Sequence, residues 1–194
     1  PMDPRLITVV APAVAQAAMD SGVAKHPIKD MEKYKRDLSS RMGIDNSLMQ
    51  QLSFRAKQNP KKVVFAEADN FKVLKAALLV KDEGIAKPIL LGNKDNIMEL
   101  IEEYQLDFNE DEILDTREAM TDKKRNEFGQ QFFDMRSRRG MTLSEAKGRM
   151  RSRNYFASMM VKNGEADAMI TGVTRKYSNC IKPSLQIIGK GKNV

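Results

Sequence analysis

The sequence predicts an α/β protein in which a parallel sheet lies between two layers of helices, with a helical appendage ahead of the sheet. Short, continuous apolar runs begin at residue 61 and alternate with segments of helical periodicity. Such runs are typical of parallel strands that are buried on both faces. Three successive alternations of strand and helix indicate parallel strands joined by right-handed crossovers. The 194 residues suffice for one domain and an appendage.

The appendage is predicted to be helical throughout. An apolar stripe of period 3.6 predicts a helix over residues 4–20, in which Pro12 favours a kink or a break. A second helix is predicted from a cap at Asp30 through Leu38. A third, over residues 46–57, ends ahead of a proline.

The remaining elements follow from the same patterns. Strands are expected over residues 61–66, 87–91, 112–115 and 166–171. Helices are expected over residues 71–80, 96–104, 122–138, 142–151 and 154–162. Asp69, just ahead of the first of these helices, is predicted to be its N-cap. Gly172 follows the fourth strand, at the carboxyl end where doubly wound sheets bind ligands.

Composition excludes several classes of protein. With 41% hydrophobic and 30% charged residues, the chain is neither disordered nor collagen-like. Its most apolar stretch, residues 9–19, is too short to span a bilayer, so no membrane association is expected. A single cysteine and a single histidine exclude an internal disulfide, a zinc cluster and a Ser-His-Asp relay. We therefore expect no metal in this chain and a cytoplasmic location. No catalytic residue is assigned to the chain.

The net charge of +7 is unevenly distributed. Residues 135–154 hold seven arginines and lysines against Glu145 alone, whereas residues 94–122 hold eleven acids and two cations. The basic run is interpreted most simply as solvated helix faces. An anion site or a nucleic-acid face is the alternative.

The strongest candidate site is the polar segment that leaves the fourth predicted strand. Its glycine lets the backbone approach a ligand, its hydroxyls can donate, and its cations can bind phosphate or carboxylate. The candidates from this segment are Gly172, Thr174, Arg175, Lys176, Tyr177, Ser178 and Lys182, to which Glu67 is added from the end of the first strand. A solvated loop followed by a helix is the alternative.

Two parts of the chain resemble known proteins. Asp3-Pro-Arg-Leu, residues 10–24 and Pro27-Ile28 resemble the end of the catalytic part of bacterial bifunctional malic enzymes. The phosphotransacetylase-like domain that follows in those enzymes is similar in further motifs. These are Val64-Phe65-Ala-Glu67, Val73-Leu74-Lys-Ala-Ala77, Pro88-Ile-Leu-Leu-Gly92, Tyr155-Phe156-Ala157, Met159-Met160-Val161, Gly164-Glu-Ala-Asp-Ala168 and Pro183-Ser-Leu-Gln-Ile-Ile188.

This resemblance implies that the chain is a piece of a longer polypeptide. Residues 1–45 would be the malic-enzyme tail, residues 46–58 a linker helix, and residues 59–194 the first half of a Rossmann-like, phosphotransacetylase-like domain. It further implies NADP and a divalent metal, Mg or Mn, in the malic-enzyme region and none in this chain. The effector would be acetyl-CoA or an acyl phosphate, and the chain would self-associate as a dimer or a larger homo-oligomer.

The chain departs from true phosphotransacetylases at the positions that hold their substrates. Where that family carries a histidine, a serine, two threonines and an arginine, this chain carries Arg175, Lys176, Tyr177, Cys180 and Lys182. Lysine cannot bind phosphate bidentately as arginine does, so transferase activity is in doubt. The resemblance therefore implies a regulatory, oligomerising domain. An active phosphate acetyltransferase and a nucleic-acid binder are the alternatives.

Overall fold

A computed structural model describes residues 5–41 and 46–191 of the chain. The chain divides into two compact units, residues 1–55 and 56–194. The boundary between the units falls inside the segment 46–58, which the sequence predicts to be a linker helix. The assignment of these parts to regions of a longer enzyme remains a prediction.

The first unit is helical, as expected. It contains α1 (Arg5–Asp20) and α2 (Met31–Arg41), which pack against each other, and most of α3 (Asn46–Gln58). The predicted cap at Asp30 is confirmed, because its Oδ1 accepts a hydrogen bond of 2.9 Å from the Lys33 amide. The break expected at Pro12 does not occur. Helix α1 runs through this residue, which is buried, so packing compensates for the amide hydrogen bond that proline lacks.

The second unit is built on a parallel sheet, in agreement with the predicted fold class. Its strands are β1 (Lys61–Phe65), β2 (Ala86–Leu91), β3 (Ile113–Leu114) and β4 (Ala168–Ile170). They lie in the order β3-β2-β1-β4, and every pairing is parallel. In register, Phe65 of β1 lies opposite Leu90 of β2 on one side and Ile170 of β4 on the other.

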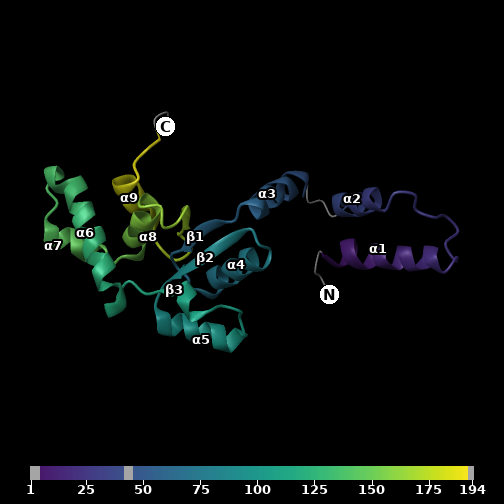
Figure 1. Cartoon of the computed structure of the whole chain (residues 1–194), viewed down its shortest axis with the longest axis horizontal. Helices are drawn as coiled ribbons and strands as arrows, with labels where there is room; N and C mark the ends of the chain where they lie inside the picture. The colour runs from purple at the N-terminus through teal and green to yellow at the C-terminus, as the bar shows by residue number, and fades with distance from the viewer. Residues whose placement is uncertain (1–4, 42–45, 192–194) are drawn as a thin grey trace. The chain divides into compact units, whose positions relative to one another are not determined.

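Helices cover both faces of this sheet, so the core has two halves. Val64 and Leu91 point to the face covered by α6 (Asp122–Arg136), α7 (Leu143–Arg149), α8 (Arg153–Lys162) and α9 (Tyr177–Ile187). Phe65 and Leu90 point to the opposite face and pack beneath α4 (Phe71–Asp82) and α5 (Lys94–Tyr104). Figure 1 shows α8 and α9 on one side of the strands and α4 on the other. The alternation along each strand is the period of two that separates the faces of a sheet.

One predicted helix cap is wrong. Asn70, not Asp69, caps α4, and its side chain accepts a hydrogen bond from the Lys72 amide. The carboxylate of Asp69 instead forms a two-point ion pair with Arg153, with both N···O distances at 2.7 Å. Asparagine and aspartate cap helices about equally well, so neighbouring candidates cannot be distinguished until the ion-pair partner is known.

The helical excursion between β3 and β4 contains the expected breaks. Helix α6 gives way to a 3-10 turn that ends at Gly140, whose φ of 81° favours glycine. Thr142 caps α7, and Ser152 stands at the N-cap of α8. Helix α8 is the central helix, because every residue from Asn154 to Met160 is buried. Within the described ranges, no helix is long and apolar enough to cross a membrane.

A close approach between α6 and α7 yields the first prediction. A Cβ atom at Gly129 of α6 would lie 2.7 Å from Cγ and 2.8 Å from Cα of Lys147 in α7. We expect Gly129→Ala to lower the free energy of unfolding by up to about 2 kcal/mol, because overpacking costs about 1–3 kcal/mol and the helix-propensity gain offsets only about 1 kcal/mol of this. Urea denaturation measures the change.

Gly148→Ala is the matched control. Gly148 also lies within a helix, but a Cβ there would meet nothing within 4 Å. This variant should be neutral or slightly stabilising. Equal effects of the two substitutions would contradict the packing argument.

Candidate functional site

The candidate site lies where the order of the strands reverses. After β3 the chain returns to place β4 beside β1, and ligands of open α/β sheets bind at such reversals, beyond the carboxyl ends of the strands. A cavity of about 830 Å³ occupies this position. It is lined by Ala66, Glu67, Arg117, Arg149, Arg151, Ser152, Arg153, Asn154, Tyr155, Arg175, Asn179, Lys182 and Pro183.

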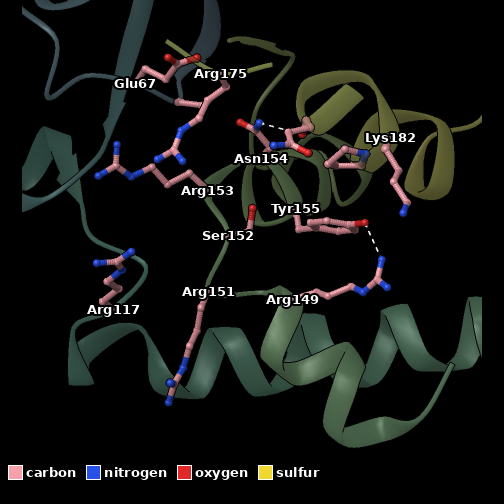
Figure 2. Close-up of a pocket in the computed structure, with 13 residues that line it drawn as sticks. Glu67, Arg117, Arg149, Arg151, Ser152, Arg153, Asn154, Tyr155, Arg175 and Lys182 are labelled. Atoms are coloured by element: carbon pink, nitrogen blue, oxygen red, sulfur yellow. Dashed lines mark hydrogen bonds between the residues drawn. The ribbon is translucent and has the colours of Figure 1, made fainter. Parts of the chain in front are cut away.

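The cavity is strongly cationic. Five arginines and one lysine line it, and Glu67 is the only carboxylate among these lining residues. Figure 2 shows that the cations approach from separate parts of the chain: the loop after β3, the α7–α8 turn, the loop after β4, and α9. A cleft lined with charge of one sign attracts ligands of the opposite sign.

Two of the arginines are held in place by other side chains. Arg149 Nη1 donates to the Tyr155 hydroxyl at 2.7 Å, and its Nη2 contacts Glu145 at 2.5 Å. The side-chain hydrogen bond with Glu145 is the main reason that the pKa of Arg149 is raised. Arg153 is fixed by its two-point ion pair with Asp69. These two guanidinium groups are therefore oriented before any ligand arrives.

The other cations are available to a ligand. Within residues 5–41 and 46–191, no hydrogen bond or ion pair engages the side chains of Arg117, Arg151, Arg175 or Lys182. Four positive charges without a carboxylate partner repel one another, and a bound polyanion would relieve this repulsion.

The start of α8 adds backbone donors to the cavity. Ser152, Arg153 and Asn154 line the cavity, and the first turn of α8 receives no side-chain cap from Ser152. The free amides of a helix N-terminus carry partial positive charge and bind anions. The side chain of Asn154 is buried and spans the site, since its amide donates to the Asn179 carbonyl and its Oδ1 lies 2.9 Å from the Thr171 hydroxyl oxygen.

Glu67 organises the loop that follows β4. Its side chain is 2% exposed. Its two oxygens accept hydrogen bonds from the Gly172 amide at 2.5 Å, the Thr174 amide at 2.6 Å, the Thr171 hydroxyl at 3.0 Å and the Thr174 hydroxyl. The φ of Gly172 is 111°, a conformation that other residues rarely adopt, so the loop needs glycine to present its amide to Glu67.

These hydrogen bonds keep Glu67 ionised. Burial alone would raise the pKa of this carboxyl, but the hydrogen bonds from Thr174, Gly172 and Thr171 together outweigh burial and lower the pKa to about 2. The carboxylate therefore accepts hydrogen bonds at any physiological pH, and it is a poor base.

The structure brings together only some of the predicted site residues. Glu67, Arg175 and Lys182 line the main cavity. Gly172, Arg175 and Tyr177 line a neighbouring cavity of about 670 Å³. The hydroxyl of Thr174 is engaged by Glu67. Lys176 and Ser178 line neither cavity. Their roles toward a ligand remain predictions.

Sequence reasoning missed the arginines of the α7–α8 turn. The simplest interpretation of the basic run 136–153, solvated helix faces, is wrong for Arg149 and Arg153, whose side chains are paired at the cavity as the alternative of an anion site requires. The interpretation as solvated residues is correct for Arg138 and Arg139, which are exposed. The alternation Arg149-Met-Arg151-Ser-Arg153 falls at a predicted helix break, and this coincidence was the available signal for an anion site.

Comparisons with known proteins agree with this architecture. Residues 47–194 match the sequence model of the phosphate acetyl/butaryl transferase family. A phosphotransacetylase from Streptococcus pyogenes superposes with a TM-score of 0.63 at 30% identity, covering 74% of this chain and 42% of that one. The chain therefore belongs to the phosphate acetyl/butaryl transferase family.

Malic enzymes match almost the whole chain. An NADP-dependent malic enzyme from Rhizobium meliloti is 33% identical over 199 residues, which include 97% of this chain and 26% of the enzyme. An NAD-dependent malic enzyme from the same organism is 36% identical over 197 residues, with 100% of this chain and 26% of the enzyme covered. The expected double resemblance is confirmed. The chain spans about a quarter of the length of these relatives.

The second prediction concerns the pH dependence of stability. Because the pKa of Glu67 is lowered from 4.5 to about 2 in the folded state, its stabilising contribution is complete above pH 4.5 and is lost as the pH falls toward 2. We expect Glu67→Gln to cost on the order of 2–3 kcal/mol at pH 7, and the difference from the wild type to shrink below pH 4.5. Urea denaturation at a series of pH values measures this difference.

Met120→Leu is the control at a residue that is 88% exposed, and its effect should not change over the same pH range because neither side chain titrates. A Glu67→Gln effect that is independent of pH would contradict the assignment.

Proposed function

We propose that this chain is the phosphotransacetylase-like domain of a malic enzyme and that it binds a regulatory ligand, acetyl-CoA or an acyl phosphate, in the main cavity. The observation that carries the proposal is that five arginines, one lysine and a helix N-terminus line one cavity at the carboxyl end of the sheet. Phosphate groups are the anions that such a combination binds well.

The cavity supports binding rather than acyl transfer. Transfer to coenzyme A needs a proton acceptor for the thiol. Among the described lining residues Glu67 is the only carboxylate, its oxygens already accept four hydrogen bonds, and its pKa of about 2 makes it a weak base. Tyr155 is tied to Arg149 and Gln186. The active phosphate acetyltransferase is therefore the weaker alternative.

The malic-enzyme chemistry is assigned to the parent protein. The relatives include NADP-dependent and NAD-dependent malic enzymes, so the choice of NADP rests on the first of these resemblances. In the described part of the chain, no group of three or more histidine, cysteine, aspartate or glutamate residues could hold a metal ion. We assign NADP and the divalent metal to the malic-enzyme region of the parent on the resemblance to NADP-dependent malic enzymes, and no step of this proposal uses them.

A nucleic-acid partner is less well supported. A duplex is bound by cations spread along a face, whereas several cations of the basic run surround a cavity together with Arg175 and Lys182. This arrangement favours a small anion.

The third prediction tests ligand binding. In calorimetric titrations of the whole chain with acetyl-CoA at fixed ionic strength, Arg175→Gln and Lys182→Gln should each weaken binding about tenfold or more, because each removes a charged hydrogen-bond donor worth about 1.5–3 kcal/mol. Lys87→Gln is the matched control. It removes the same charge from an exposed position near the amino end of β2, away from the cavity.

Two outcomes would overturn the proposal. Equal weakening by Lys87→Gln would indicate only general charge attraction. Turnover of acetyl phosphate and coenzyme A to acetyl-CoA, abolished by Lys182→Ala, would favour the active transferase.

The fourth prediction concerns self-association, which we propose to occur along the β4 side of the sheet. In the part of the chain that is described, β4 pairs only with β1, and apolar side chains nearby are exposed: Ile170 by 50%, Val173 by 56% and Tyr177 by 79%. Exposed strand edges and apolar patches favour association. Light scattering at micromolar concentration should give a mass above that of one chain, and Ile170→Lys should shift it toward the monomer.

Salt distinguishes the kinds of contact. Association that weakens with salt indicates pairing of the basic run with the acidic residues 95–122 of another copy, whereas association that strengthens indicates an apolar contact. A monomer throughout a hundredfold dilution would contradict the proposal.

A further inference from the structure

A second cavity lies between α6 and α7. Its volume is about 520 Å³, within the range of small-molecule sites. It is lined by Asp122, Arg125, Asn126, Ser144, Lys147, Gly148 and Arg151. Only Arg151 also lines the main cavity. Neither the family resemblance nor the proposed function makes use of this second cavity.

The charges of this cavity leave two cations without a carboxylate. Arg125 pairs with Asp122, and its Nη1 donates to the carbonyls of Thr116 at 2.6 Å and Glu118 at 3.0 Å. This pair therefore has no net charge, and the Arg125 guanidinium already has partners within the protein. Within the described ranges, the side chains of Lys147 and Arg151 have no hydrogen-bond or ion-pair partner. The net charge of the lining, three cations against one carboxylate, is +2.

Both of these cations are attached to a fixed backbone. The stem of Lys147 is held against Gly129, where even a methyl group would not fit. The carbonyl of Arg151 accepts a hydrogen bond of 3.0 Å from the Thr116 hydroxyl. Figure 2 shows the Arg151 side chain turned away from Arg153 and Arg175, the cations of the main cavity. The Arg151 guanidinium therefore lies away from the other cations of the main cavity and is available to the second cavity.

The wall of the cavity also includes a glycine that the helix itself does not require. Gly148 lies inside α7, does not have a positive φ, and would meet nothing within 4 Å if it carried a Cβ. Glycine in such a position costs about 1 kcal/mol relative to alanine. Its absence of a side chain keeps the cavity open between Ser144 and Arg151.

We propose that the cavity between α6 and α7 is a second anion-binding site that takes a phosphate group, either as inorganic phosphate or as a small phosphate monoester. Lys147 and Arg151 supply the two charges that match a dianion, with Arg151 able to donate two parallel hydrogen bonds. The Ser144 hydroxyl and the Asn126 amide supply neutral donors.

The fifth prediction tests this site by nuclear magnetic resonance of the whole chain. Inorganic phosphate is titrated at constant ionic strength, with chloride as the balancing anion. The amide signals of Ser144 and Gly148 report on the second cavity, and that of Asn179 reports on the main one. Phosphate should shift the Ser144 and Gly148 signals with saturation, and Lys147→Met should weaken this response at least tenfold without changing the response at Asn179.

Two further variants make the test specific. Lys123→Met removes the same charge from an exposed position in the first turn of α6 and should leave the titration unchanged, because Lys123 does not line the cavity. Gly148→Leu places a side chain in the open space and should abolish the response at Ser144 while all cations remain. This second route keeps the test decisive if Lys147→Met disturbs the packing on Gly129.

The amide signals distinguish failure of the second site from failure of the proposed function, because each cavity has its own reporter. Arg175→Gln should alter the response at Asn179 and spare Ser144, so failure of one site does not imply failure of the other. Equal shifts with chloride, equal loss in Lys123→Met, or an unchanged titration in Gly148→Leu would each overturn the second site. A parallel titration with glycerol phosphate identifies the source of the phosphate group: tighter binding than inorganic phosphate indicates a monoester, and weaker binding indicates the free ion.

Discussion

The buried carboxylate of Glu67 is the constraint on which the main cavity depends. It follows β1, and it receives hydrogen bonds from three residues that follow β4, although more than one hundred residues separate the two segments in sequence. A buried carboxylate is stable only when its oxygens are satisfied, so the loop after β4 must present its amides and hydroxyls to it. This requirement fixes the path of the loop, the positive φ of Gly172 and hence the position of Arg175.

Helix α8 completes the cavity from the other side. Its buried residues anchor it between the sheet and the outer helices, so its first turn cannot move away from the strand ends. Asp69 holds Arg153 at this turn, and Asn154 joins α8 to both Thr171 and α9. The rigid part of the cavity therefore consists of side chains paired within the protein. In the described part of the chain, the lining cations that have no such partner are Arg117, Arg151, Arg175 and Lys182.

This division of roles bears on the proposed function. Anion binding requires oriented positive charge, which paired arginines and a helix N-terminus provide. Acyl transfer additionally requires a group that accepts a proton near neutral pH, and the carboxylate in this cavity is held in its ionised form by the hydrogen bonds that organise the loop. The feature that builds the binding site thus removes its most obvious base.

The sequence by itself determined the layered fold, because strand and helix periodicities are local and the apolar runs of β1 and β2 end in buried residues. It did not determine the burial of β4, an edge strand that is largely exposed in the described part of the chain. It also placed the site after β4, because glycine and clustered cations at a strand end have a local signature. Only the tertiary structure decided which charges act together. Arg149 and Arg153 look like any exposed helical arginines in sequence, and their partners differ sharply in separation: Glu145 is four residues from Arg149, whereas Asp69 is eighty-four residues from Arg153. Hydrogen bonds and ion pairs act through space, so a pairing across that separation exists only after the sheet has brought the two segments together.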